Sequence, residues 1–351
     1  MAEKVLMKGN EAIAEAAIKA GCRHYFGYPI TPQTEIAAYM AKRMPKIGGT
    51  FLQAESEIAA INMVYGVASA GFRVMTSSSS PGVSLKQEGI SYIAGSDLPA
   101  LIVNVQRGGP GLGGIQPSQS DYFQATKGGG HGDYHLIVLA PASVQEMADL
   151  TVKAFDLADK YRCPAMLLAD GTMGQMMEPV VLPEVDTAPV EKPWAVTGTK
   201  NARPHNIINS LYLKPDQLEK TNFERYEKYR QIEENEVMYE SFMMEDAEYC
   251  VVAFGITARI SKNAVIAARK KGIKVGMIRP ITLWPFPTDA IAKAAEQVKG
   301  FLSVELSMGQ MIEDVRLASG CRRPVLLCNR TGGMIVSPEE VLAKIDELVA
   351  L

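Results

Sequence analysis

Two carboxylates, Glu55 and Glu57, stand where a predicted strand gives way to a predicted helix. The residues that follow, from Ile58 to Val64, place apolar side chains at helical spacing, so one face of this helix must be buried. We therefore expect at least one of the two glutamates near the protein interior. A carboxylate in such surroundings has a raised affinity for protons and can share one with a ligand nitrogen. The alternative is a helix-start carboxylate that only complements the helix dipole.

A hydroxyl and a guanidinium are expected at the same edge of the sheet. Thr31 lies in the turn that follows one predicted strand, and Arg107 follows another, the apolar run 100–106. Because ligands of open α/β sheets bind at the carboxyl ends of the strands, both side chains should lie near the glutamates. Arginine offers a bidentate fork for a ligand carboxylate. The alternatives are a turn residue for Thr31 and a surface or interdomain ion pair for Arg107.

Two further segments at this edge carry possible ligand contacts. The run Thr76-Ser-Ser-Ser-Ser80 offers hydroxyls to a ring or a phosphate, and its alternative is a capped helix start. The Gly-rich segment 107–114 is not a dinucleotide fingerprint, because Pro110 interrupts it and no amphipathic helix follows. It is better interpreted as a mobile loop for a substrate or a partner.

The elements that must position these residues alternate between strand and helix over residues 1–178. This pattern predicts a doubly wound α/β domain with a parallel sheet. Within it, Asn10 is expected to cap a helix that ends at Lys19, and Ser143-Val-Gln-Glu146 is a capping box that begins another helix.

The rest of the chain divides into two parts. Prolines punctuate the segment 179–247, and its second half, 215–247, is highly charged with few apolar positions. We expect a linker followed by a surface helix or an arm against a partner. Residues 248–351 alternate again between strand and helix, which predicts a smaller α/β domain.

Composition excludes several classes of function. The chain has 351 residues, 47% of them hydrophobic, and a net charge of -3, so neither nucleic acid nor a membrane surface is an expected partner. No apolar run approaches the ~20 residues of a membrane span, and the N-terminus lacks a signal-peptide core, so a cytoplasmic protein is expected. The five cysteines form no C-x-x-C pair, which favours reduced buried thiols over an iron–sulfur cluster or a zinc ribbon. No metal site is predicted.

Six segments, in order along nearly the whole chain, resemble the alpha subunit of 2-oxoacid:ferredoxin oxidoreductases. They are Gly27-Tyr-Pro-Ile-Thr-Pro, Gln53-Ala-Glu-Ser-Glu, Thr76-Ser-Ser-Ser-Ser-Pro-Gly, Asn104-Val-Gln-Arg-Gly-Gly-Pro, Pro117-Ser-Gln-Ser-Asp and Gly276-Met-Ile-Arg-Pro-Ile-Thr-Leu-Trp-Pro-Phe-Pro. Length and overall pattern are closest to the 2-oxoisovalerate (branched-chain) type, with the 2-oxoglutarate type next.

The resemblance implies a thiamine diphosphate enzyme divided over several chains. Its first domain would be the thiamine-diphosphate-binding (pyrimidine-type) domain, and its second a transketolase C-terminal-like α/β domain. Glu57 matches the family glutamate that hydrogen-bonds the aminopyrimidine ring of the cofactor. Thr31 matches the threonine near the substrate carbonyl and carboxylate, and Arg107 the arginine that holds the carboxylate. The other cofactor-binding residues that it implies are Pro29, Ile30, Ser78 and Ser79.

The implied reaction is oxidative decarboxylation of a branched-chain 2-oxoacid with coenzyme A, giving acyl-CoA, carbon dioxide and reduced ferredoxin. The family's Gly-Asp-Gly motif and asparagine pair, which hold Mg²⁺ and diphosphate, are absent. The nearest segment, Ala169-Asp-Gly-Thr172, lacks the first glycine. Diphosphate and Mg²⁺ are therefore expected on a beta subunit and the iron–sulfur clusters on a ferredoxin-like subunit. With a gamma subunit these would complete the enzyme, and this chain alone would be inactive.

Two other hypotheses remain open. A non-catalytic scaffold subunit would dock ferredoxin or coenzyme A and contribute nothing to the thiamine. A nucleotide-linked dehydrogenase is the third hypothesis, and the failed glycine fingerprint opposes it.

Overall fold

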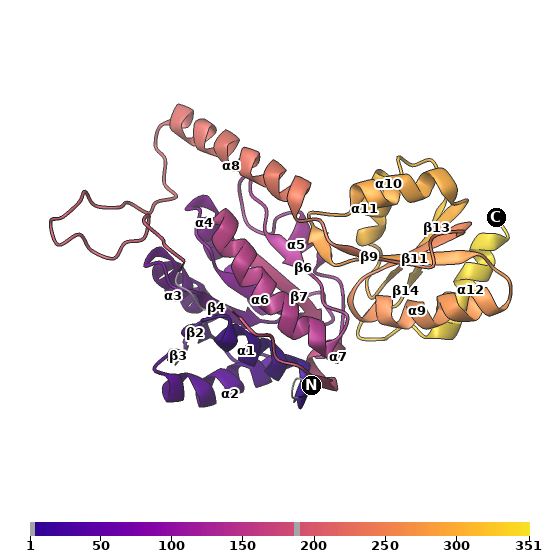
Figure 1. Ribbon diagram of the computed structural model, residues 1–351, viewed down its shortest axis with the longest axis horizontal. Coiled ribbons are helices and arrows are strands. Elements are labelled where there is room, and N and C mark those ends of the chain that lie inside the picture. Colours follow the sequence, from indigo (N-terminus) through magenta and orange to yellow (C-terminus); the bar gives the residue numbers. More distant parts are fainter. Residues whose placement is uncertain (1–3, 186–189) are drawn as a thin grey trace.

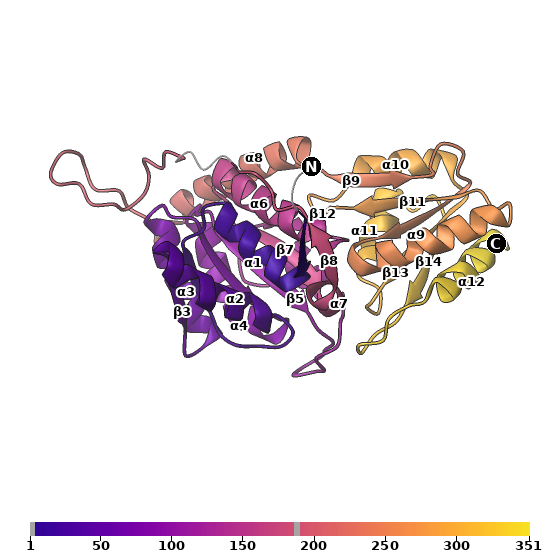
Figure 2. The same cartoon turned by 60° about the horizontal axis from the view of Figure 1, so that its bottom comes forward.

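The computed structural model describes residues 4–185 and 190–351. Figure 1 shows two α/β lobes, with helix α8 (Pro215–Asn235) lying along the first of them. The segment that leads into α8 projects beyond the first lobe in both views (Figures 1 and 2). Among the described residues, no helix has the length and apolar character needed to cross a membrane.

A seven-stranded sheet forms the first lobe, in the order β12-β6-β7-β5-β4-β2-β3. Its neighbours are all parallel except for β12, which pairs antiparallel with β6. The chain runs outward from β2 to β3 and then returns to β4 on the other side of β2, so the strand order reverses there. A ligand site is expected at such a point, beyond the carboxyl ends of the strands. The strands are β2 (His24–Gly27), β3 (Thr50–Gln53), β4 (Val74–Ser78), β5 (Leu101–Gln106), β6 (Ile137–Leu139), β7 (Ala165–Asp170) and β12 (Thr282–Trp284).

Helices pack on this sheet in two groups. One group has α1 between α2 and α6, and in the other α3 packs against α4. The strands β1 (Val5–Lys8) and β8 (Met177–Val180) form a separate antiparallel pair beside α1 and α6. The helices of this lobe are α1 (Gly9–Lys19), α2 (Thr34–Arg43), α3 (Glu57–Ser69), α4 (Pro81–Gly95), α5 (Tyr122–Thr126), α6 (Val144–Tyr161) and α7 (Gly171–Gln175), with a 3₁₀ turn at Met44–Ile47.

The second lobe is built on a five-stranded sheet in the order β14-β13-β10-β11-β9. All its pairs are parallel except that of β9 with β11. The alternation read from the sequence thus gives two α/β sheets, and the predicted fold class is confirmed. The elements are β9 (Tyr239–Phe242), β10 (Tyr249–Ala253), α9 (Gly255–Lys270), β11 (Val275–Pro280), α10 (Thr288–Gln297), β13 (Gly300–Glu305), α11 (Met311–Ala318), β14 (Val325–Asn329) and α12 (Pro338–Val349).

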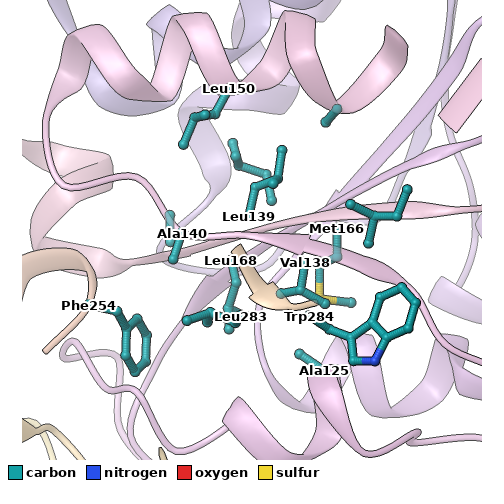
Figure 3. Packing of buried hydrophobic residues seen from close by; sticks show 14 of the residues in the cluster. Ala125, Val138, Leu139, Ala140, Leu150, Met166, Leu168, Phe254, Leu283 and Trp284 are labelled. Atoms are coloured by element: carbon teal, nitrogen blue, oxygen red, sulfur yellow. The ribbon is translucent and has the colours of Figure 1, made fainter. Parts of the chain in front are cut away.

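Strand β12 ties the two lobes together. It follows β11 in the chain but pairs with β6, at the edge of the first sheet. Its residues Leu283 and Trp284 are buried in the core of the first lobe, among Val138, Met166 and their neighbours (Figure 3). A segment that the sequence placed wholly in the second domain therefore completes the sheet of the first.

The arm predicted over residues 215–247 is only partly a surface helix. Helix α8 accounts for its first part, with Tyr229 and Ile232 buried on one side. The strand β9 then joins the second sheet beside β11, so the end of this segment belongs structurally to the second lobe.

The predicted cap at Asn10 is wrong, because helix α1 begins one residue earlier, at Gly9. The Asn10 side chain is buried and donates instead to the carbonyl oxygen of Pro32 and to Glu35, at 2.8 Å each. It therefore anchors the turn that carries Thr31. The predicted capping box at Ser143 forms only in part. The Ser143 hydroxyl accepts from the Glu146 backbone at 3.1 Å, but the Glu146 carboxylate accepts from the backbone of Ala142 at 2.8 Å rather than from that of Ser143.

Candidate active site

Glu57 is the buried member of the predicted pair of carboxylates. Ser56 caps helix α3 by accepting a hydrogen bond from the Ala59 backbone at 3.2 Å, which places Glu57 in the first helical turn. The side chain of Glu57 is 6% exposed, whereas Glu55 precedes the helix and is exposed. Over residues 4–185 and 190–351, no protein group donates a hydrogen bond to the Glu57 carboxylate. A nearly buried acceptor without a partner is suited to a ligand donor.

The serine run beside Glu57 divides into structural and free hydroxyls. Ser77 bonds Tyr25 at 2.7 Å and Gln33 at 2.5 Å, which fixes the end of β4. Ser78 and Ser79 are fully buried, and within the described chain their hydroxyl oxygens have no partner. These two are the serines that the family resemblance assigned to the cofactor, and that role stays a prediction.

Gly82 keeps open the space next to Glu57. A Cβ at this position would stand 2.7 Å from the Oε1 atom of Glu57 and would overlap the hydroxyl of Ser78. Any side chain at residue 82 would therefore displace the carboxylate or the serine. The sequence analysis missed this role, although residue 82 lies in one of the six family segments.

The structure brings Arg107 and Thr31 together. The Nη1 atom of Arg107 donates to the carbonyl oxygen of Thr31, and Nη2 donates to that of Leu112, both at 3.0 Å. Arg107 is 7% exposed, and its Nε is buried with no partner among the described residues. No carboxylate in the described chain forms an ion pair with it, so the alternative of an ion pair is not seen. Thr31 is exposed, as is Pro29, and Ile30 is half-buried.

A hydrogen-bonded cluster fixes the backbone between these groups. Ser80 has a positive φ of 26°, an unfavourable conformation for a residue with a side chain. Its hydroxyl donates to Asp121 at 2.6 Å, and its amide donates to Asn104 at 3.1 Å. Asn104 also donates to Asp121 at 2.9 Å. Burial raises the pKa of Asp121, and the hydrogen bonds from Ser80 and Asn104 oppose this rise.

A cavity of about 690 Å³ lies between the two lobes, next to Arg107. The first lobe contributes Arg107, the Gly-rich residues 108–111 and the cluster around Ser80. The second contributes Met308, Gln310 and Thr331. Gln310 also donates to the carbonyl oxygen of Ser120 at 2.7 Å, so the lobes are in direct contact beside the cavity.

Two family models match consecutive parts of the chain. Residues 15–244 match the thiamine-diphosphate-binding domain of pyruvate flavodoxin/ferredoxin oxidoreductases, and residues 247–341 match core domain II of pyruvate:ferredoxin oxidoreductase. The chain belongs to the 2-oxoacid:ferredoxin oxidoreductase family. The predicted family and enzyme class are thereby confirmed.

Full-length relatives support this placement. The ketoisovalerate oxidoreductase subunit VorB of Methanothermobacter marburgensis is 56% identical over 98% of this chain and 97% of its own length. The 2-oxoglutarate synthase subunit KorA of Methanothermobacter thermautotrophicus is 37% identical over 97% of this chain and 98% of its own length.

Two solved structures share the fold. The 2-oxoglutarate:ferredoxin oxidoreductase of Magnetococcus marinus, solved with 2-oxoglutarate, coenzyme A and succinyl-CoA bound, matches with a TM-score of 0.87 and 28% identity. The match covers 99% of this chain and 66% of that chain. A split-gene transketolase matches with a TM-score of 0.61 at 12% identity, which shows a shared fold alone.

In this oxidoreductase subunit, Asp170 stands in the segment nearest to the missing diphosphate motif, and it has a structural role. Its carboxylate caps α7 by accepting from the backbones of Thr172 and Met173, at 2.9 and 3.1 Å. Burial raises its pKa to about 6. Within the described residues, no three His, Cys, Asp or Glu side chains gather as a metal site.

Lys86 is a buried lysine close to Glu57 whose position the sequence analysis missed. It lies on α4 and is fully buried, and its Nζ donates to the hydroxyl of Thr76 at 2.9 Å and to the carbonyl oxygen of Ser77 at 3.1 Å. Burial lowers its pKa to about 7, and the charge of Glu57 opposes this fall. A single lysine in an amphipathic helix reads as a solvated residue, so the sequence carried no signal of its burial.

Proposed function

We propose that this chain is the alpha subunit of a thiamine-diphosphate-dependent 2-oxoacid:ferredoxin oxidoreductase. Its substrate would be a branched-chain 2-oxoacid such as 2-oxoisovalerate, and the products acyl-CoA, carbon dioxide and reduced ferredoxin. The observation that carries the proposal is the buried Glu57 carboxylate, which lacks a protein partner and stands beside the space that Gly82 keeps open.

The residues present fit the aminopyrimidine end of thiamine diphosphate. That cofactor, when bound, supplies the carbon nucleophile that decarboxylation of a 2-oxoacid requires. Glu57 would hold a proton between its carboxylate and a ring nitrogen, which is the task of a positioned acid–base group. The unpartnered hydroxyls of Ser78 and Ser79 would contact the same cofactor, and Pro29 and Ile30 would line it from the turn after β2.

Arg107 and Thr31 are suited to hold the substrate. The two terminal nitrogens of Arg107 are fixed by backbone carbonyls, and its Nε is left for a ligand. A substrate carboxylate would take this Nε, and the hydroxyl of Thr31 would lie near its carbonyl. The cavity beside Arg107 offers room for the remaining parts of the reactants, including the thiol end of coenzyme A.

Other chains would complete the enzyme. We assign diphosphate and Mg²⁺ to a beta subunit, because Asp170 is engaged in a helix cap. The iron–sulfur clusters would lie on a ferredoxin-like subunit, a gamma subunit would join the complex, and free ferredoxin would accept the electrons. The relatives' names describe subunits, in agreement with such an assembly. A cytoplasmic location belongs to the same proposal. So do a first domain of residues 1–178, a connecting segment 179–247 whose strand β9 joins the second sheet, and a second domain of residues 248–351 whose strand β12 joins the first sheet.

The exposed side of α8 would contact one of these partner chains. Leu218, Phe223 and Tyr226 line a surface hollow of about 590 Å³ together with charged residues of the helix. Phe223 is 70% exposed. A large aromatic side chain with this exposure beside other apolar groups is characteristic of an interaction surface.

The substrate class rests on the relatives. The identity to the VorB subunit is 56%, against 37% to a KorA subunit over a similar share of the chain. The test is co-purification of the complex, followed by measurement of kcat/KM for 2-oxoisovalerate and 2-oxoglutarate. We expect a clear preference for 2-oxoisovalerate. The opposite preference would assign the chain to the 2-oxoglutarate type. Turnover that does not change when Glu57 is replaced would favour the scaffold hypothesis.

A further inference from the structure

Lys86 is a buried cation for which the proposed function gives no role. Its side chain is fully buried, and its ammonium group has three protons to donate but only two acceptors in the described chain, Thr76 and Ser77. Both acceptors are neutral. A buried ammonium without a bonded carboxylate is unusual, because the desolvation of its charge is costly and no ion pair offsets that cost.

The packing of α3 against α4 places Lys86 on the face of α4 that contacts the helix of Glu57. Residues 82, 86 and 89 share one face of α4, being four and then three positions apart. Gly82 lies against Glu57, and Gly89 lies against Ile61, one turn further along α3. Lys86 is thus bracketed by two close contacts between the same pair of helices.

Glu57 is the charged group that faces Lys86. Its carboxylate on α3 acts on the ammonium across the helix contact, and the groups that β4 presents are the neutral Thr76 and Ser77. The hydroxyl of Tyr25 reaches this region only through Ser77, and burial raises the pKa of Tyr25 far above neutrality, so it stays uncharged. Within the described residues, two opposing effects therefore set the protonation of Lys86: burial favours the neutral amine, and the carboxylate of Glu57 favours the ammonium.

We propose that Lys86 is the internal proton source for the pair formed by Glu57 and a bound ring nitrogen. This inference rests on the proposed function, because it needs a nitrogenous ring against Glu57. When the ring binds, Lys86 loses a proton from Nζ and becomes neutral, and one proton comes to lie between the ring nitrogen and the Glu57 carboxylate. The total charge of the three groups is unchanged, so this step draws no proton from the solvent. Lys86 would act through Glu57 and is therefore a positioning residue.

Lys86 would lose its proton because the negative charge of Glu57 is neutralised when the ring binds. While no ring nitrogen shares a proton with Glu57, the charge of its carboxylate favours the ammonium form of Lys86. A proton held between Glu57 and the ring removes that support, while Lys86 stays buried. Desolvation then acts alone and favours the neutral amine.

The test is a count of protons exchanged when thiamine diphosphate binds. The assembled complex is titrated with the cofactor by calorimetry in buffers of different ionisation enthalpy, and wild type is compared with Lys86→Met. The diphosphate contributes equally in both proteins, so the difference reports Lys86. Since its pKa is about 7, the variant should take up about one more proton than wild type at pH 6, about half a proton more at pH 7, and close to none more at pH 8.

Two further variants sharpen the comparison. Thr76→Val keeps the lysine and removes one acceptor from its ammonium, so the pH at which the proton count changes should be lower than in wild type. This variant provides the test if Lys86→Met does not assemble. Gln87→Met changes the next residue of α4, which packs against Tyr134 rather than Glu57, and should leave the proton count as in wild type. Cofactor binding with the same proton count in wild type, Lys86→Met and Thr76→Val at every pH would overturn the inference and leave the proposed function standing. Failure of wild type to bind the cofactor at all would instead contradict the proposed function.

Discussion

Arg107 donates a hydrogen bond to the backbone carbonyl of Thr31 at 3.0 Å and so joins the end of β5 to the turn after β2. The carbonyl of Leu112 holds the second terminal nitrogen of the guanidinium. The fork is thus oriented by main-chain atoms before any ligand arrives. Such preorganisation lowers the entropic cost of binding a substrate carboxylate.

Replacement of this arginine should weaken substrate binding more than turnover. A hydrogen bond to a charged group contributes about 1.5–3 kcal/mol, so Arg107→Ala should raise KM for the 2-oxoacid by roughly 10- to 150-fold. Arg107→Lys keeps the positive charge but loses the planar guanidinium fork, so its KM should lie between those of wild type and Arg107→Ala. Steady-state kinetics of the assembled complex checks this, and an unchanged KM in Arg107→Ala would argue against a substrate role.

Gly82→Ala should impair cofactor binding without unfolding helix α4. The new Cβ would stand 2.7 Å from Glu57 Oε1, so the carboxylate must move, while alanine itself is favourable in a helix. We expect at least about tenfold weaker binding of thiamine diphosphate, or about 1.4 kcal/mol, by calorimetry of the complex. Gly66→Ala on α3 is the matched control, because its Cβ meets nothing within 4 Å. Equal affinity in the two variants would show that the space beside Glu57 is not used.

Asp170→Asn should change the pH dependence of stability. Burial raises the pKa of Asp170 from 3.8 to about 6, so the folded state binds its proton more tightly than the unfolded state. This contribution is present below about pH 4 and is lost as the pH rises through about 6. Asparagine still caps the helix but has no charge to bury, so the variant should gain up to about 3 kcal/mol relative to wild type at pH 8.

Denaturant unfolding at pH 4.5 and pH 8 checks this prediction. The gain of Asp170→Asn should shrink at the lower pH, where the wild-type carboxyl is protonated in the folded state. A difference between the two proteins that does not vary with pH would contradict the raised pKa of the Asp170 carboxyl.

Phe223→Ser should weaken assembly and leave the chain folded. Phe223 is 70% exposed on α8, so its loss removes no core contact, whereas an aromatic residue at the centre of an interface contributes strongly. We expect at least about tenfold weaker association with the other subunits, or about 1.4 kcal/mol, measured by titrated co-purification. Glu224→Gln, at the next exposed position of the same helix, is the control and should assemble normally. Unimpaired assembly of Phe223→Ser would remove α8 from the proposed interface.

The sequence predicted the placement of those candidate residues whose positions follow from strand ends. Thr31, Glu57 and Arg107 lie beyond the carboxyl ends of the parallel strands β2, β3 and β5, and the topology of such a sheet brings these ends to one edge. Helical spacing also required that a glutamate be buried, and the cap at Ser56 decided that it is Glu57 rather than Glu55.

The features that escaped prediction depend on contacts between distant segments. Lys86 is buried because Gly82 and Gly89 let α3 approach α4. A single sequence does not indicate that these two glycines lie at a helix contact. Strand β12 has three residues, and its partner β6 lies far away in the chain. Asn10 looked like a helix cap because its type is favoured there, but its bonds to Pro32 and Glu35 are tertiary.

The most direct measurement is the turnover of Glu57→Gln in the assembled complex, with Glu55→Gln as the matched control. Glutamine keeps the size of the side chain and removes its ability to hold a proton, and the effect of losing a positioned acid–base group is about 10²- to 10⁴-fold. We predict normal assembly of both variants, a fall of that order in kcat for Glu57→Gln, and near wild-type turnover for the exposed Glu55→Gln. Near-normal turnover of Glu57→Gln would contradict the assignment of Glu57 to the cofactor.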